Sequence, residues 1–164
     1  MGAGELQVRP ARDDERGFIE RRVAELWGLP VVGLGRVHDV SAMPALVCAG
    51  AGEPLGFATY DPQANGACEL VTILALRSRA GVGSALLEGV AREATRVGCR
   101  RLWLVTSNDN LDALRFYQRR GLRIAAVHPG AMEAVRALKP GLPATGSYGI
   151  PLRDLIELEL DLTP

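Results

Sequence analysis

Apolar residues follow two different periodicities along this chain. Residues 13–26 and 84–97 carry them at helical spacing, which predicts two amphipathic helices. Residues 68–76 form a mostly apolar run that is typical of a central strand. Residues 156–160 alternate strictly between apolar and acidic side chains, which predicts a strand with one solvated face. The chain therefore combines helices with strands.

Shorter signals fill in the pattern between these segments. The turn at residues 52–54 separates two apolar stretches and predicts a hairpin, and Asp13 or Asp14 is expected to cap the first helix. Glycines interrupt the pattern of residues 31–44, which is left unassigned. The other expected strands are residues 6–10, 46–49, 56–60, 101–106 and 122–127, and the other expected helices are residues 110–121 and 132–138. These elements predict one domain, residues 1–164, of the α/β (α+β) class, with helices on both faces of a mixed sheet.

Composition narrows the class of protein. The chain has 164 residues, of which 48% are hydrophobic, and a formal net charge of zero, so we expect neither disorder nor a general affinity for nucleic acid. Its apolar stretches are shorter than a membrane span. The three cysteines are widely separated, so we expect reduced thiols and no metal framework. We expect a cytoplasmic protein without membrane partners, and its arginine-, alanine- and glycine-rich usage indicates a GC-rich bacterial genome.

The clearest chemical signal is a glycine turn that follows the long apolar run. The chain leaves the predicted strand at Leu76, turns through two glycines and enters a helix at Ser84. Backbone N–H groups at such a turn point at one spot in front of the positive end of the helix, which favours a phosphate group. The predicted phosphate-binding residues are Arg79, Ala80, Gly81, Val82, Gly83 and Ser84.

Two common glycine-loop motifs do not fit this turn. A Walker A loop requires Lys-Ser or Lys-Thr after its last glycine, whereas Gly83 is followed by Ser84 and Ala85. A dinucleotide loop requires a third glycine where Leu86 stands. ATP, GTP and NAD are therefore not the expected ligands, although short glycine turns also occur as plain loops.

A second motif follows one strand later. Residues 110–122 read Asn-Leu-Asp-Ala-Leu-Arg-Phe-Tyr-Gln-Arg-Arg-Gly-Leu. Two helical turns separate Asn110 from Tyr117, so both side chains lie on one helix face. Together with Ser-Arg-Ala-Gly-Val-Gly at residues 78–83, this motif resembles the GCN5-related N-acetyltransferase (GNAT) family, whose signature Gln/Arg-x-x-Gly-x-Gly/Ala binds the pyrophosphate of acetyl-coenzyme A.

The resemblance spans roughly residues 54–122 and has two departures. Ser78 stands where the family has Gln or Arg, although Arg77 and Arg79 flank it, and Leu122 replaces the usual Phe. The family fold implies a mostly antiparallel central sheet. The family activity implies that acetyl-CoA is the cosubstrate and that an amine of a small molecule or peptide attacks the thioester directly.

The resemblance also implies roles for individual residues. Tyr117 is the candidate acid for the departing thiolate, because a phenol keeps its proton at neutral pH; the alternative is a core aromatic residue. Asn110 can bind the amides of the pantetheine arm, cap its helix, or do both. A backbone N–H group in the stretch from Leu74 to Leu76 is expected to bind the oxyanion.

The base that deprotonates the amine is less clearly indicated. Glu69 lies within the apolar run, where a carboxylate would be desolvated and suited to accepting a proton. If Glu69 instead lies at an exposed strand end, water serves as the base. His38 and His128 are weaker candidates, and the acidic residues of the 156–160 strand are read as an ordinary solvated face.

Two functional classes remain at this stage. The first is an N-acetyltransferase. The second is a sensor or regulatory module of the same fold that binds acyl-CoA without catalysing a reaction. Tyr117 favours the enzyme, since a sensor needs no acid. The sequence does not identify the amine acceptor, and a monomer and a homodimer are both compatible with it.

Overall fold

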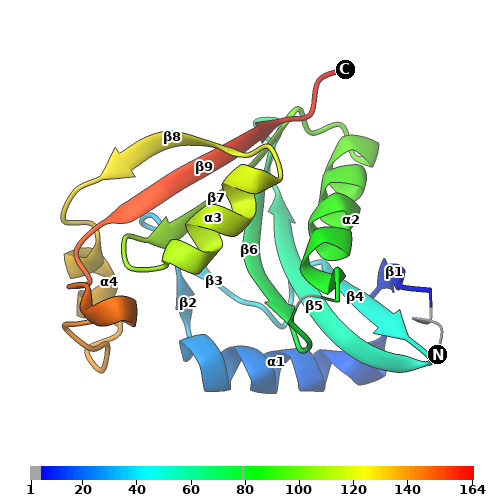
Figure 1. Ribbon diagram of the computed structural model, residues 1–164, viewed down its shortest axis with the longest axis horizontal. Coiled ribbons are helices and arrows are strands. Elements are labelled where there is room, and N and C mark those ends of the chain that lie inside the picture. Colours follow the sequence, from blue (N-terminus) through cyan, green and yellow to red (C-terminus); the bar gives the residue numbers. More distant parts are fainter. Residues whose placement is uncertain (1–4, 79) are drawn as a thin grey trace.

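The computed structural model of the protein describes residues 5–78 and 80–164, and Figure 1 shows its arrangement. Arg79, one of the predicted phosphate-binding residues, lies outside the described residues. The helices are α1 (Asp13–Trp27), α2 (Val82–Arg96), α3 (Leu111–Arg119) and α4 (Met132–Leu138), with a short 3₁₀ turn at Ser147–Gly149. The strands are β1 (Gln7–Pro10), β2 (Val31–Val32), β3 (Val37–His38), β4 (Ala45–Gly50), β5 (Glu53–Pro62), β6 (Ala67–Ala75), β7 (Arg101–Ser107), β8 (Arg123–His128) and β9 (Leu155–Asp161).

Seven of these strands form one mixed sheet in the order β1-β4-β5-β6-β7-β9-β8. Its neighbouring pairs are antiparallel except β6 and β7, which run parallel. The parallel pairing covers only the stretch from Ala67 opposite Arg101 to Glu69 opposite Trp103. Beyond it the two strands diverge toward their carboxyl ends (Figure 1). The prediction of a mixed, mostly antiparallel sheet is confirmed.

Helices cover both faces of the sheet, and strand alternation explains why. On β4, Leu46 and Cys48 point into the core that α2 and α3 complete, whereas Val47 points into the core beneath α1. On β9, Leu158 belongs to the α2–α3 core and Leu155 packs with α4. The α2–α3 face and the α1–α4 face are therefore the two sides of one sheet.

The unassigned segment 31–44 contains a small separate hairpin. β2 pairs with β3 through Val31 opposite His38 and Val32 opposite Val37. Two-residue strands carry too little periodicity to be recognised in a sequence. Because of this hairpin, His38 becomes a buried residue on the α1–α4 side of the sheet.

The starts of two helices differ from the prediction. α1 is not capped by Asp13 or Asp14; Arg12 occupies the N-cap, and its N–H donates to the Glu15 carboxylate at 2.8 Å. α2 begins at Val82, two residues earlier than expected, because Gly81 takes a left-handed conformation with φ 78° that a glycine adopts without strain.

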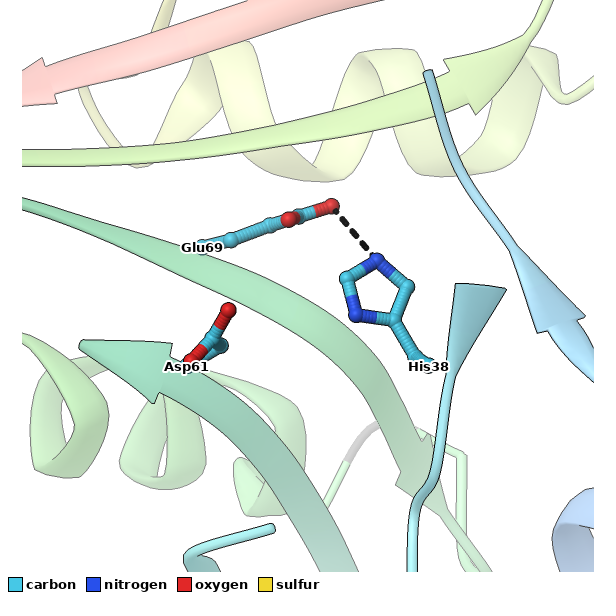
Figure 2. A group of neighbouring side chains, drawn as sticks. All are labelled: His38, Asp61 and Glu69. Atoms are coloured by element: carbon cyan, nitrogen blue, oxygen red, sulfur yellow. Dashed lines mark ion pairs between the residues drawn. The ribbon is translucent and has the colours of Figure 1, made fainter. Parts of the chain in front are cut away.

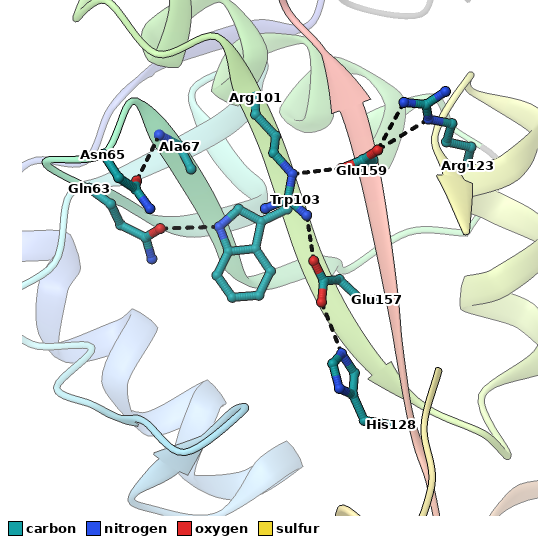
Figure 3. Close-up of polar contacts among 9 residues, drawn as sticks. All are labelled: Gln63, Asn65, Ala67, Arg101, Trp103, Arg123, His128, Glu157 and Glu159. Atoms are coloured by element: carbon teal, nitrogen blue, oxygen red, sulfur yellow. Dashed lines mark hydrogen bonds and ion pairs between the residues drawn. The ribbon is translucent and has the colours of Figure 1, made fainter. Parts of the chain in front are cut away.

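The acidic face of β9 is paired rather than simply solvated, which corrects the sequence reading (Figure 3). Glu157 accepts hydrogen bonds from Arg101 and, at 2.9 Å, shares one with His128. Glu159 accepts from Arg101 at 2.6 Å and from Arg123 at 3.0 Å. Cross-strand neighbours supply these partners, so the spacing within β9 could not reveal them.

We expect the Glu15 carboxylate to make folding stability depend on pH. Its hydrogen bond with Arg9 lowers its pKa to about 2. A folded-state pKa below the unfolded value adds stability above pH 4.5, and that stability is lost as the pH falls toward 2. Glu15→Gln should therefore lower the unfolding free energy by on the order of 2 kcal/mol at pH 7. The unfolding free energy of this variant should also decrease less than that of the wild type when the pH is lowered.

Urea unfolding between pH 7 and pH 3 measures this effect. Glu20→Gln is the matched control, because Glu20 is an exposed glutamate on the same helix. An unfolding free energy of the Glu15 variant that equals that of the Glu20 variant at every pH would contradict the prediction.

Among residues 5–78 and 80–164, no helix has both the length and the apolar character that crossing a membrane requires.

Candidate active site

The divergence of β6 and β7 opens a gap in the middle of the sheet. A register shift opposite Thr59 leaves Val71 as an extra residue on β6, and such a bulge bends the strand that carries it. Two cavities meet at this gap, one of about 410 Å³ and one of about 300 Å³. The residues that line both are Trp27, Leu70, Val71, Val105, Thr106 and Asn110.

The smaller cavity, named here the α2–α3 cavity, is lined by one residue of the predicted glycine loop. Gly83 lines it from the first turn of α2, and Phe116 and Tyr117 line it from α3. A Cβ at Gly83 would lie 3.1 Å from the Phe116 ring, so the glycine also allows α2 and α3 to approach. Val82, by contrast, is buried in the core, so only its backbone can contribute to a phosphate site.

Tyr117 is both a core residue and a cavity residue. Its side chain belongs to the α2–α3 core, where its ring lies edge-on to Phe116 with centroids 5.2 Å apart. Burial raises the pKa of its phenol above the usual value. The hydroxyl therefore keeps its proton well above neutral pH, and Tyr117 reaches the α2–α3 cavity in its protonated form.

Asn110 caps α3, as one of its two sequence interpretations predicts. Its side-chain oxygen accepts from the Ala113 N–H at 3.3 Å, and its amide nitrogen donates to the Thr106 hydroxyl at 3.1 Å. The side chain is exposed and lies where the two cavities meet. Contact with pantetheine remains a prediction.

The backbone of β6 offers donors near the gap at Ala75, within the predicted stretch, and at Ile73, just before it. The N–H of Leu76 donates to the Leu55 carbonyl at 2.8 Å, so it points toward β5. N–H groups alternate in direction along a strand, and Leu74 therefore points the same way. The N–H groups of Ile73 and Ala75 point toward the gap, and both residues line the α2–α3 cavity.

The larger cavity, named here the α1–α4 cavity, contains Glu69 and His38. Glu69 is 2% exposed, so it does not lie at an exposed strand end. Its Oε1 lies 3.3 Å from Nε2 of His38, which is 6% exposed (Figure 2). On its other side, Nη1 of Arg36 is 3.7 Å from Oε2. The predicted base is thus buried and faces a cavity.

His128 is distant from this chemistry. It lies on the edge strand β8, where it pairs with Glu157 (Figure 3), and it lines neither cavity. The sequence treated His128 and His38 alike, and the structure separates them.

Sequence reasoning missed Arg120. This residue is the C-cap of α3, and its guanidinium lies 3.7 Å from the centre of the Phe116 ring. Its Nε donates to the Ser84 hydroxyl at 2.7 Å, which brings a positive charge to the first turn of α2. Ser78 leaves that loop without the usual Gln or Arg, and Arg120 comes from a different helix. Its position just after the Asn110–Tyr117 motif was the available signal.

Comparisons with known proteins agree with this architecture. Residues 10–122 match the acetyltransferase (GNAT) family. The Bacillus subtilis protein YdhI is 36% identical over 137 residues, which cover 81% of this chain and 84% of YdhI.

Solved structures share the whole fold. An IAA acetyltransferase from Bacillus cereus superposes with a TM-score of 0.72 at 18% identity and covers 96% of this chain and 99% of its own. A Bacillus subtilis acetyltransferase in complex with CoA gives 0.70 at 19% identity and covers 97% and 100%. A family match that covers most of the sheet, together with the relationship to YdhI, leads to one conclusion: the chain belongs to the GNAT acetyltransferase family.

Proposed function

We propose that the protein transfers an acetyl group from acetyl-CoA to a primary amine of a small molecule or peptide. The observation that carries this proposal is the meeting of two cavities at the gap between β6 and β7. A protonated phenol, Tyr117, lines one cavity, and a buried carboxylate, Glu69, lines the other. A thioester in the gap would have a proton donor on one side and a proton acceptor on the other.

Acetyl-CoA would bind on the α2–α3 side. Its pyrophosphate would accept hydrogen bonds from the N–H groups of residues 80–84 at the start of α2, where the helix dipole favours an anion. Arg120 adds a positive charge next to Ser84, and its guanidinium compensates for Ser78. The pantetheine arm would run along the α2–α3 cavity toward Asn110. The similar structures with bound CoA or acetyl-CoA support this choice of cosubstrate.

The reaction would then proceed in one direct attack. Glu69 accepts a proton from the acceptor ammonium, and the free amine adds to the thioester carbonyl. The N–H groups of Ile73 and Ala75 stabilise the oxyanion. The carbon–sulfur bond breaks as the carbonyl re-forms, the nitrogen of the intermediate releases its second proton to water, and Tyr117 protonates the thiolate. The tyrosinate then regains a proton from water. The products are the N-acetylated amine and free CoA.

The alternative is an acyl-CoA sensor of the same fold. The large α1–α4 cavity, joined to the α2–α3 cavity at the gap, argues against it. A sensor needs a site for the acyl-CoA alone, whereas an enzyme needs a second site for the acceptor.

Release of free thiol from acetyl-CoA tests the proposal. The purified protein should be assayed with primary alkyl and arylalkyl amines, amino acids, polyamines and a short peptide, with tertiary amines as the control. We expect turnover with at least one primary amine and none with the tertiary amines. Binding of acetyl-CoA without thiol release on the whole panel would favour the sensor.

A further inference from the structure

We propose that His38 is a catalytic residue: together with Glu69 it binds the acceptor ammonium and takes up the proton that leaves it. This inference rests on the proposed acetyl transfer. It also assigns the acetyl acceptor to a chemical class: a primary ammonium group attached to an apolar group.

Two buried atoms on neighbouring side chains that line the same cavity make no hydrogen bond. Within residues 5–78 and 80–164, four buried side-chain nitrogen or oxygen atoms make no hydrogen bond, and two of them are His38 Nε2 and Glu69 Oε2. Buried polar groups without partners are rare in native proteins and require an explanation. Nε2 also lies 3.3 Å from Glu69 Oε1 (Figure 2). In the tautomer with its proton on Nδ1, His38 presents a lone pair to that carboxylate, and a shared donor would satisfy both.

A primary ammonium is a donor of the right kind. It carries three N–H groups, so one ion can donate to the carboxylate and to the imidazole together. Space is present as well, since both side chains line the cavity of about 410 Å³. Apolar side chains form a large part of the remaining wall, among them Val31, Val71, Val105, Met132, Val135 and Leu155. Thr106, Ser107, Asp109 and Ser147 add polar atoms to it.

The surrounding charges also favour a cation. Arg36 Nη2 lies 2.9 Å from Asp61 and Nη1 lies 3.7 Å from Glu69. One guanidinium and two carboxylates leave one negative charge when His38 is neutral. Lys139 and Asp109 also line the cavity and carry opposite charges. The Lys139 ammonium donates to the Trp27 and Gly28 carbonyls at the end of α1. A bound ammonium would therefore balance the charge at Glu69.

The proton can move between the two residues. Glu69 removes one proton from the ammonium and leaves a neutral amine, which then attacks the thioester. The proton passes from the Glu69 carboxyl to Nε2 of His38, which becomes an imidazolium beside the carboxylate. Loss of this proton to solvent returns the pair to its starting state. Because Nε2 lies 3.3 Å from Oε1 of Glu69, the two side chains form one short path for the proton.

Kinetics of four variants tests this assignment, with benzylamine and n-hexylamine as acceptors. His38→Gln keeps an amide at the position of Nε2 but accepts no proton, and Glu69→Gln removes the carboxylate. The double variant carries both changes. His128→Gln is the matched control, because His128 is the only other histidine in the chain and also faces a glutamate, outside both cavities.

We expect His38→Gln to lower kcat/KM for the amine on the order of 10²-fold, with unchanged acetyl-CoA affinity. Its pH–rate profile should also change on the acidic side, because the proton of the ammonium then has Glu69 as its single acceptor. Residues that act as one unit are not additive, so the double variant should be no slower than the slower single variant. His128→Gln should stay within twofold of the wild type.

Imidazole nitrogen NMR of the wild-type protein provides a test that needs no variant. Benzylammonium added to the CoA complex should shift the His38 signals and leave those of His128 in place. Unmoved His38 signals, or a His38→Gln rate within threefold of the wild type, would overturn the proposal. Loss of wild-type activity on treatment with EDTA would overturn it too, because a metal ion would then hold His38 and Glu69. If the wild type transfers no acetyl group to any amine, the proposed function itself fails.

Discussion

Gly83→Asp should weaken coenzyme A binding about 10²–10³-fold while the protein stays folded. Gly83 lies in the first turn of α2, where the pyrophosphate is proposed to bind. At about 4 Å, a carboxylate and a phosphate charge repel by roughly 1 to 4 kcal/mol between bulk water and the protein surface. The same negative charge is favourable for the helix itself, because it lies at the positive end of the dipole.

The effect of the charge of the new side chain on CoA affinity must be distinguished from the effect of its size. A Cβ at Gly83 would lie 3.1 Å from the Phe116 ring, so any substitution presses on α3. Gly83→Asn has nearly the same shape and no charge, which makes it the matched control. Calorimetry with CoA should show a much larger loss for Asp than for Asn, and circular dichroism should show that both are folded. Equal affinities for the two variants would mean that no phosphate lies near this residue.

Tyr117→Phe should lower kcat by about 10²–10⁴-fold, the range typical of a general acid. Its hydroxyl is the proposed proton donor to the CoA thiolate, and burial raises its pKa so that it stays protonated at neutral pH. The acetyl-CoA affinity should change little, because the aromatic ring still packs against Phe116. Thiol release under saturating acetyl-CoA and amine measures the effect.

Tyr60→Phe is the control for the loss of a buried tyrosine hydroxyl. Tyr60 belongs to the same α2–α3 core and is as buried as Tyr117, but it lines neither cavity. Its variant should keep wild-type kcat. A Tyr117→Phe rate within threefold of the wild type would assign Tyr117 to the core alone.

The sequence by itself determined most of the helices and strands and pointed to the family. The strand β9 and the helices α1 and α2 were predictable, because burial of one face imposes a local period of 2.0 or 3.6 residues. The strand β6 was predictable because a central strand buried on both faces is a continuous apolar run. The glycine turn and the Asn110–Tyr117 motif could also be recognised in the sequence. Each is a short segment, and the backbone geometry of one turn or one helix fixes the spacing of its residues.

Only the tertiary structure decided which distant residues meet. The divergence of β6 and β7 depends on the order of seven strands, and no local spacing encodes it. The β2–β3 hairpin is too short to carry a period, yet it brings His38 against Glu69, 31 positions further along the chain. Arg120 likewise reaches Ser84 from another helix. The candidate site is made of such long-range contacts, which exist only after the sheet has formed and its two faces have been covered.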